Sequence, residues 1–595
     1  MKSIFRPSLV ALGIIGLSSL TACNDFLTVE PTATDTPETV FSTVTGAYNS
    51  VIGAYAPLAG DASYGNRISG YFPYDSEDFL NSPTGDDAGE GRRGIARYNS
   101  AVTNADVRNA WNALYRGIGR ANVCIKYIPE MELYNTPGAA GYEEVRRLHG
   151  EALTLRAQYF FELVRNWGDV PAPFEATETG QDFNIPRVDR NIIFDRLLAD
   201  LDLAAKLVPW RSTAGAANER ITKGAVKALR ARVALYRAGF YFDPKTSRVE
   251  RAADYRKFYD TVRVECRELM AMRGEHTLNT SFEEPFRSIA EYRRDAANEI
   301  VFQVAMGGTV NAGSTDSKLG YFNGPRTAIS GGTQTQGAIV VQPTYFYAFD
   351  PTDTRRDVTI APYTVDASSR RVPANLITAY DGKFRREWSS NAAVRNSAAQ
   401  SMGYNWPLIR FSDVLLMFAE AENEALNGPS TDAQAALREV RARAYGSATL
   451  PAMPGSYTDF RDAIIRERNL EFGGEGIRKY DLMRWNLLGA KFQEIKNTLR
   501  AWTNATTPNL NIPTYMYYIT QTVPGPLVAV NSYYGPSPTS NPPSGQTRVN
   551  WRNSITEARI ADIAASYVDA RQLLPIPAES RNTNPLLTQN PSYAQ

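Results

Sequence analysis

Residues 467–485, ERNLEFGGEGIRKYDLMRW, place acidic and basic side chains three or four positions apart on both sides of Gly473-Gly474. Side chains at those spacings share a face of a helix, where an exposed pair of opposite charges stabilises by only ~0.2–0.5 kcal/mol. We expect this stretch to tie two helices and a turn together. The competing interpretation is a carboxylate pair for glycoside cleavage, which in a retaining enzyme stands ~5–5.5 Å apart and flanks the bond. Carboxylates one helical turn apart point the same way, so the structural interpretation is preferred.

Apolar residues recur at helical spacing on both sides of this stretch. The predicted helices cover residues 111–122, 145–164, 192–208, 223–239, 252–272, 411–426, 433–444 and 460–488. Thr36-Pro37 is typical of a helix start and Asn427-Gly428 of a helix end. Paired helices joined by short turns indicate tetratricopeptide-like hairpins, although their ~34-residue consensus is not cleanly repeated. The predicted fold is mainly α, with helical hairpins as a scaffold, long irregular loops and minor β-structure.

Two stretches lack this periodicity. Residues 309–405 are rich in Gly, Thr, Ser, Asn and Tyr, with a short strand predicted within 338–343, and residues 503–546 are rich in Pro. Irregular segments of this length are usually functional or mobile. We therefore divide the chain into a helical region, a loop-rich ligand-side region and a C-terminal region that includes the second loop: 38–308, 309–405 and 406–595.

The N-terminus resembles a bacterial lipoprotein signal. Lys2 and Arg6 precede an apolar run at residues 8–20, which is shorter than the ~20 residues that span a bilayer. Leu20-Thr21-Ala22-Cys23 then matches a lipobox, so residues 1–22 are predicted to be removed and Cys23 to be acylated. Three acyl chains form a durable anchor, with residues 23–37 as a leash. An ordinary secretory signal with a coincidental Cys is the alternative.

The composition excludes several classes of function. The 64 Lys+Arg balance 63 Asp+Glu, which argues against a protein built to hold nucleic acid. With 2 His and 3 Cys, and with no phosphate-binding loop or zinc motif, the sequence predicts no metal site and no cofactor. Cys124 and Cys266 are expected to be buried free thiols rather than a disulfide. The 32 Tyr, 25 Phe and 8 Trp favour a protein that binds a ligand over an enzyme that converts one.

Further motifs follow one another along nearly the whole chain. They lie at residues 24–27, 111–122, 152–160 with 166–171, 350–357, 407–421, 467–485, and 574–577 with 584–593. Together with the lipobox, they resemble the SusD/RagB family of outer-membrane nutrient-binding lipoproteins. The resemblance implies a lipid-anchored protein exposed on the surface of a Bacteroidetes-type Gram-negative bacterium. It also implies a TonB-dependent transporter of the SusC type as partner, to which a captured glycan or peptide is delivered without catalysis.

Ligand residues vary within such a family, so candidates come from chemistry and loop placement. Sugar C–H faces stack on aromatic rings, and sugar hydroxyls need polar partners. Mixtures of both occur in two sets of loops, which supply the candidates Tyr64, Tyr71, Tyr74, Asp75, Asn81, Arg97 and Tyr98, and Tyr321, Phe322, Asn323, Trp388 and Tyr404. For each single aromatic residue, packing against the helical body is the competing interpretation.

The predicted function is therefore capture of an oligosaccharide or polysaccharide at the cell surface and its transfer to the transporter. A peptide ligand is an alternative within this class. A secreted glycan-active hydrolase and a helical-repeat assembly scaffold without a small ligand are the alternatives outside it.

Overall fold

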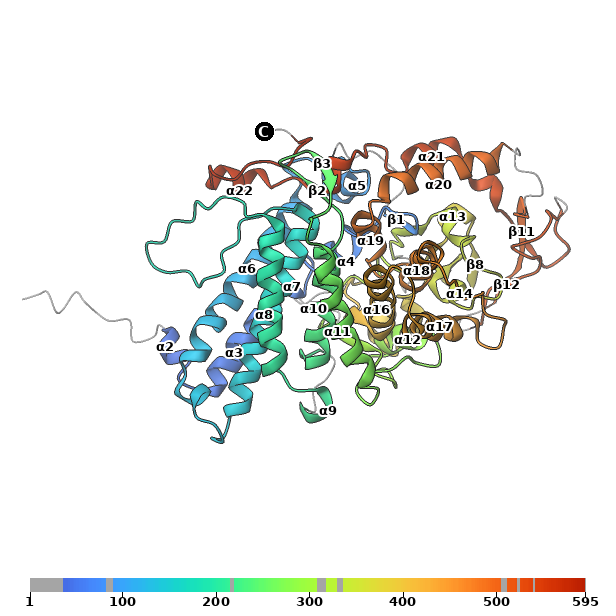
Figure 1. Ribbon diagram of the computed structural model, residues 1–595. Coiled ribbons are helices and arrows are strands. Elements are labelled where there is room, and N and C mark those ends of the chain that lie inside the picture. The colour runs from blue at the N-terminus through green and yellow to red at the C-terminus, as the bar shows by residue number, and fades with distance from the viewer. Residues whose placement is uncertain are drawn as a thin grey trace, which may run out of the picture.

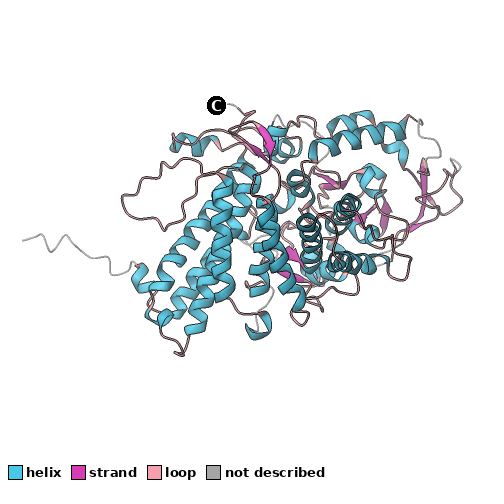
Figure 2. Ribbon diagram, in the orientation of Figure 1, coloured by secondary structure: helices cyan, strands magenta, loops and turns pink. Residues whose placement is uncertain are grey.

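The computed structural model describes residues 36–81, 89–214, 219–307, 317–328, 335–504, 511–521, 525–538 and 541–593. The predicted signal peptide, Cys23 and nearly all of the leash lie outside these residues. The described chain is mainly α-helical, with short strands gathered into small sheets (Figures 1 and 2). No helix in the described ranges is both long and apolar enough to cross a membrane.

Long helices stand side by side in the N-terminal half (Figure 1). In chain order they and the shorter helices between them are α2 Pro37–Val40, α3 Val44–Tyr55, α4 Arg67–Gly70, α5 Gly91–Ala96, α6 Ala105–Tyr127, α7 Tyr142–Trp167, α8 Arg190–Leu207, α9 Arg211–Ala214, α10 Lys223–Arg237, α11 Arg256–Ala271 and α12 Glu284–Ala290. Helix α7 packs against α6 and α8, and α10 packs against α8 and α11. Consecutive helices that pack in this way confirm the predicted mainly α scaffold.

Local sequence sets the ends of these helices. Thr36 caps α2 by accepting from the N–H of Thr39, and Asn104 caps α6 by accepting from the N–H groups of its first turn. Helix α7 ends at Trp167, and the next residue, Gly168, has a φ of 75°, which favours glycine. Nearly all of α7 is buried, which makes it the central helix of this half.

The C-terminal half contains a second set of helices, most of which lie at the right of Figure 1, whereas the last helix, α22, lies at its upper left. They are α13 Pro343–Phe346, α14 Arg355–Thr359, α15 Ala392–Arg395, α16 Phe411–Leu426, α17 Thr431–Tyr445, α18 Tyr457–Phe472, α19 Arg478–Arg484, α20 Leu488–Thr503, α21 Glu557–Asp562 and α22 Ala578–Thr583. The helix predicted at residues 411–426 is confirmed, and it ends at Asn427 in the left-handed conformation.

The single helix predicted over residues 460–488 is wrong. Helix α18 ends at Phe472 and α19 begins at Arg478. Between them, Gly474 and Gly476 adopt φ values of 80° and 71°, which an α-helix does not allow. Residues 473–477 therefore form a turn between the two helices, and α19 leaves it in a new direction.

Short strands form five sheets in the described residues. The largest has the order β1-β5-β9-β6 and is antiparallel; the others pair β10 with β4, β11 with β12 and β13, β2 with β3, and β7 with β8. The strands are β1 Phe79–Asn81, β2 Tyr241–Asp243, β3 Arg248–Glu250, β4 Ile300–Val304, β5 Ile339–Val341, β6 Ile360–Ala361, β7 Tyr363–Val365, β8 Arg371–Pro373, β9 Tyr380–Asp381, β10 Trp406–Arg410, β11 Tyr515–Ile519, β12 Val528–Ala529 and β13 Thr547–Asn550. Strand β5 confirms the strand predicted within 338–343. Strands β11 and β12 correct the expectation that 503–546 lacks regular structure.

Single turns of 3₁₀ helix connect several of these elements. They are η1 Ala56–Leu58, η2 Ile128–Glu130, η3 Glu132–Asn135, η5 Leu376–Thr378, η6 Arg386–Trp388, η7 Arg552–Ser554 and η8 Asp569–Gln572.

Cys124 on α6 and Cys266 on α11 are free and buried, and burial raises the pKa of the Cys124 thiol to about 12.

The charged stretch 467–485 lies at the centre of the fold. Glu471 is fully buried and accepts from Arg410, Arg443 and Arg355. Burial opposes ionisation, but the surrounding guanidinium groups, Arg443 first, hold the pKa of Glu471 well below its ordinary value. The stretch does join two helices and a turn, as predicted. Its partners, however, come mostly from distant elements rather than from the same helix face.

Candidate functional site

The structure separates the predicted ligand residues into several places. All of them except Arg97 are buried. Tyr64 lies inside the helical body, where it donates to Glu162 and accepts from Gln158 Nε2 at 2.7 Å. It therefore packs and does not face a ligand.

Trp388 and Tyr404 also serve packing. The Trp388 ring lies under the guanidinium of Arg385, 4.6 Å from the ring centre, and is 6% exposed. The Tyr404 hydroxyl donates to the Arg385 carbonyl at 3.3 Å and is fully buried. Arg97 is half-buried and pairs with Asp562 at 3.2 Å.

Five further candidates form a buried polar network beside the Gly473-Gly474 turn. Tyr74 donates to the Gly474 carbonyl at 2.9 Å and accepts from Asn323 Nδ2 at 3.0 Å. Asn323 Nδ2 also donates to Asp381, whose pKa burial raises to about 7. This network ties the 71–81 segment to the centre of the fold.

Asp75 occupies the other end of that network. Its Oδ1 accepts from the N–H of Asn81 at 3.1 Å, and its carbonyl accepts from the Tyr98 hydroxyl at 2.7 Å. Burial raises the pKa of Asp75 and lowers that of Lys479, whose charge opposes the rise at Asp75. The Lys479 ammonium stands 4.7 Å from the centre of the Tyr98 ring. These groups are enclosed, so they are supports of the loops and not contact residues.

The remaining three candidates, Tyr71, Tyr321 and Phe322, come together just below the surface; we call them the aromatic platform. Phe322 stands edge-to-face on Tyr71 at 6.1 Å and on Tyr321 at 5.1 Å between ring centres. Each ring is 7% exposed. Segments about 250 residues apart in sequence, around α4 and before β5, therefore supply one aromatic surface.

Polar side chains that the sequence analysis missed cover the platform. The Arg92 guanidinium lies 5.0 Å from the centre of the Phe322 ring and 5.8 Å from that of Tyr71. Arg92 also donates to the Gln336 side-chain oxygen at 3.2 Å, and exposed Arg326 donates to the Gln336 carbonyl at 3.3 Å. The only signal for Arg92 was its place between the candidate aromatic residues at 64–81 and at 98.

This arrangement has the chemistry of a site for a polyhydroxylated ligand. A ligand that approaches the platform first meets two guanidinium groups and an amide, which are hydrogen-bond donors and acceptors for hydroxyl groups. Beneath them lie the aromatic rings of the platform, and aromatic rings are the groups on which the C–H face of a sugar stacks.

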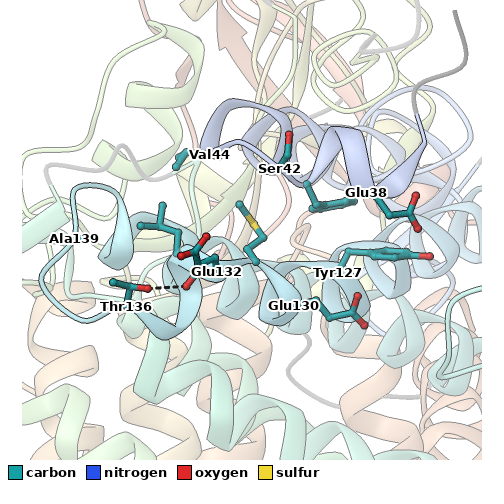
Figure 3. A pocket seen from close by; sticks show the side chains of 11 residues that line it. Glu38, Ser42, Val44, Tyr127, Glu130, Glu132, Thr136 and Ala139 are labelled. Atoms are coloured by element: carbon teal, nitrogen blue, oxygen red, sulfur yellow. Dashed lines mark hydrogen bonds between the residues drawn. The ribbon is translucent and has the colours of Figure 1, made fainter. Parts of the chain in front are cut away.

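Two hollows in the described chain lie away from the platform. A cavity of about 670 Å³ lies between α2 and the end of α6, lined by Glu38, Tyr127, Glu130 and Glu132 among others (Figure 3). It adjoins the start of the described chain, and none of the predicted ligand residues lines it. A groove of about 830 Å³ lies among α13, α18 and α20. Within the described ranges, no group of three or more His, Cys, Asp or Glu side chains is placed to hold a metal ion.

Comparison with known proteins identifies the class. The SusD family model matches residues 298–593, and a model described as "Starch-binding associating with outer membrane" matches residues 78–235. The two matches together span most of the chain, which belongs to the SusD family.

Relatives and solved structures agree with this assignment. SusD-like protein P25 of Formosa agariphila is 25% identical over 534 residues, covering 83% of this chain and 92% of its own. A SusD homolog from Bacteroides thetaiotaomicron superposes with a TM-score of 0.73 at 21% identity, covering 93% of this chain and 97% of its own. A structure named as a laminarin-binding SusD-like protein superposes with a TM-score of 0.62 at 21% identity, covering 92% and 99%. Surface glycan-binding protein A from Bacteroides fluxus superposes with a TM-score of 0.62 at 19% sequence identity, covering 93% of this chain and 100% of its own.

Proposed function

We propose that this protein is a lipid-anchored surface protein that binds a neutral oligosaccharide at the aromatic platform and delivers it to a SusC-type TonB-dependent transporter. The observation that carries the proposal is the platform itself. Tyr71 and Phe322 lie under Arg92, with Arg326 and Gln336 alongside. Ring faces and hydroxyl-binding groups occur together there, as recognition of a sugar requires.

The relatives support a glycan as the ligand. Structures of similar fold carry the names laminarin-binding and surface glycan-binding protein. The near balance of 64 basic and 63 acidic residues gives no preference for a polyanionic ligand. A peptide remains the alternative ligand within the binding class.

The proposed attachment depends on Cys23 and the preceding lipobox. In this proposal Cys23 carries the acyl chains in the outer membrane, and residues 23–37 join it to the helical body. The family description "Starch-binding associating with outer membrane" supports this location.

Binding without catalysis is the proposed mode of action. The carboxylates of the 467–485 stretch are engaged by cations: Glu467 by Arg441, Glu471 by Arg410, and Asp481 by Arg468. Against the opposing effect of burial, the neighbouring arginines lower the pKa of Glu471 and of Asp481, and a carboxylate held ionised in this way is a poor general acid. These groups are also buried, where a glycosidic bond does not reach them.

Three measurements test the proposal. Calorimetric titration with laminarihexaose, maltohexaose and xylohexaose should show binding to at least one sugar and no hydrolysis products. Cys23→Ala should move the protein from the membrane fraction to the soluble fraction. Affinity purification of the wild-type chain from its native membranes should recover a large β-barrel transporter. Absence of sugar binding, or turnover of a bound sugar, would contradict the proposal.

A further inference from the structure

The groove among α13, α18 and α20 contains polar groups that the fold leaves without partners. Asn469 on α18 is 8% exposed, and its side-chain oxygen has no hydrogen-bond partner in the described part of the chain. The Thr344 hydroxyl on α13 is likewise buried and unpartnered within those residues. Both residues line the groove. An unsatisfied buried polar group costs ~1–3 kcal/mol, so two such groups beside one groove, on α13 and on α18, are candidates for hydrogen bonds to an external partner.

The same groove has an aromatic wall. Trp502, near the end of α20, stands edge-to-face on Tyr347, with 5.5 Å between ring centres. Tyr347 is itself fixed, because its hydroxyl accepts from Trp551 Nε1 at 2.7 Å. Trp502 is half-buried, and among the described residues its indole N–H makes no hydrogen bond. Trp502 therefore offers both a ring surface and a free donor on a rigid support.

Charges in the groove are balanced and mostly paired. Arg466 pairs with Asp350 at 3.2 Å, Lys491 pairs with Glu494 at 2.9 Å, and Arg478 pairs with Glu77. Arg461 and Asp462, one of each sign, form no ion pair in the described chain. A groove of this kind attracts neither polyanions nor polycations, and a neutral ligand fits it best.

The groove and the platform have no lining residue in common, but strand β5 connects them. Gln336 at the platform precedes strand β5, and Thr344 in the groove follows it. Eight residues of fully extended chain span at most roughly 29 Å, so Gln336 and Thr344 lie within that distance of each other. The groove volume, about 830 Å³, lies within the range typical of ligand sites.

We propose that this groove is a second binding site, distinct from the platform, for a neutral oligosaccharide. Trp502 and Tyr347 stack on the sugar, while Asn469, Thr344 and the Trp502 N–H bond its hydroxyl groups. The class of ligand in this inference rests on the proposed function. The location of the site and its contacts rest on the residues that line the groove.

Calorimetric titration of the full chain in detergent with laminarihexaose, maltohexaose and xylohexaose tests it. Two variants change the groove by different means: Trp502→Ala removes the ring, and Ala490→Trp fills the groove from its exposed rim. Arg92→Ala changes only the platform, and Tyr48→Ala, which removes an exposed side chain of α3, is the control for loss of an aromatic ring. Thermal melting verifies that each variant is folded.

Wild type should bind two molecules of one of the three sugars. Each groove variant should bind one, and Arg92→Ala should weaken the other site at least fivefold, while Tyr48→Ala binds two. Binding that Arg92→Ala abolishes, and that both groove variants leave unchanged, would overturn the second site and leave the proposed function intact. A wild type that binds none of the three sugars would overturn both proposals. Retention of peptides from a tryptic digest by wild type, but not by Trp502→Ala, would overturn the oligosaccharide as the groove's ligand.

Discussion

Arg410, the last residue of β10, donates one hydrogen bond of 2.7 Å to each carboxylate oxygen of Glu475. Glu475 lies in the turn between α18 and α19, so this two-point contact fastens that turn to the β10–β4 sheet. Both side chains are buried. Bidentate guanidinium–carboxylate pairs fix geometry as well as contribute energy, which explains how one charged stretch organises both halves of the chain.

Removal of the Arg410 guanidinium should be among the most damaging single changes. Arg410→Met leaves Glu475 and Glu471 in the interior with fewer compensating charges, and breaking such a buried pair typically costs about 3–5 kcal/mol of unfolding free energy. Urea denaturation followed by circular dichroism measures the loss. Arg500→Met, which breaks an exposed pair with Glu557, is the matched control and should leave the unfolding midpoint almost unchanged. Equal losses in the two variants would contradict the central role of Arg410.

Gly473 should tolerate no side chain. A Cβ atom there would collide with the Tyr345 ring, whose hydroxyl donates to the Asn469 carbonyl at 2.9 Å and is held in place. Gly473→Ala is expected to destabilise by about 1–3 kcal/mol, as overpacking of a core does. Gly455→Ala is the control, since its Cβ would meet nothing within 4 Å. A melting temperature that falls only in Gly473→Ala supports the close approach seen here; no fall in either variant would refute it.

The sequence predicted local features well and distant contacts poorly. The helix at 411–426 was predicted residue for residue, because apolar spacing and Asn427 are local signals. The Gly473-Gly474 pair predicts the turn, but nothing near it predicts the close approach of Tyr345, more than a hundred residues away. Likewise, nothing near Tyr74 reveals that its hydroxyl meets the carbonyl of Gly474.

In the candidate site, too, local features can be predicted from the sequence and contacts between distant residues cannot. Aromatic loops were recognised, but their burial depends on the folded chain, so Tyr64 and other predicted residues turned out to be internal. Tyr71 and Phe322 belong to two different candidate loops in the sequence, and the fold places them together. Arg92 cannot be predicted in the same way, because the contact between its guanidinium and the distant Phe322 ring has no counterpart in the spacing of residues along the sequence.

His149 should make stability fall at mildly acidic pH. Burial first, and then the charges of Arg156 and Arg146, lower the pKa of His149 to about 4, whereas the unfolded chain keeps a value of ~6.5. Below pH ~6.5 the unfolded state therefore binds a proton that the folded state does not. The contribution to stability is complete above that pH and is lost as pH falls to about 4, by up to about 3 kcal/mol.

Urea denaturation of wild type and His149→Gln at several pH values between 4 and 7.5 tests this expectation. Gln keeps a polar group near the Tyr134 hydroxyl, which lies 2.9 Å from His149 Nδ1. The variant should lose less stability than wild type over this range. His276, whose pKa is also lowered by burial, contributes a remaining slope in both proteins. Parallel pH profiles would show that His149 titrates normally in the fold.

Ligand affinity should depend on the platform and not on the other predicted aromatic residues. Phe322→Ala removes the ring that contacts Tyr71, Tyr321 and Arg92, and loss of one stacking partner, worth about 1 kcal/mol, weakens binding roughly fivefold. Trp388→Ala is the contrasting variant: Trp388 is buried under Arg385, so its loss should lower the melting temperature and leave the dissociation constant unchanged. Titration with the sugar that wild type binds most tightly, at a temperature where both variants are folded, separates the two effects. Weaker binding by Trp388→Ala together with unchanged binding by Phe322→Ala would move the ligand site from the platform to the neighbourhood of Arg385.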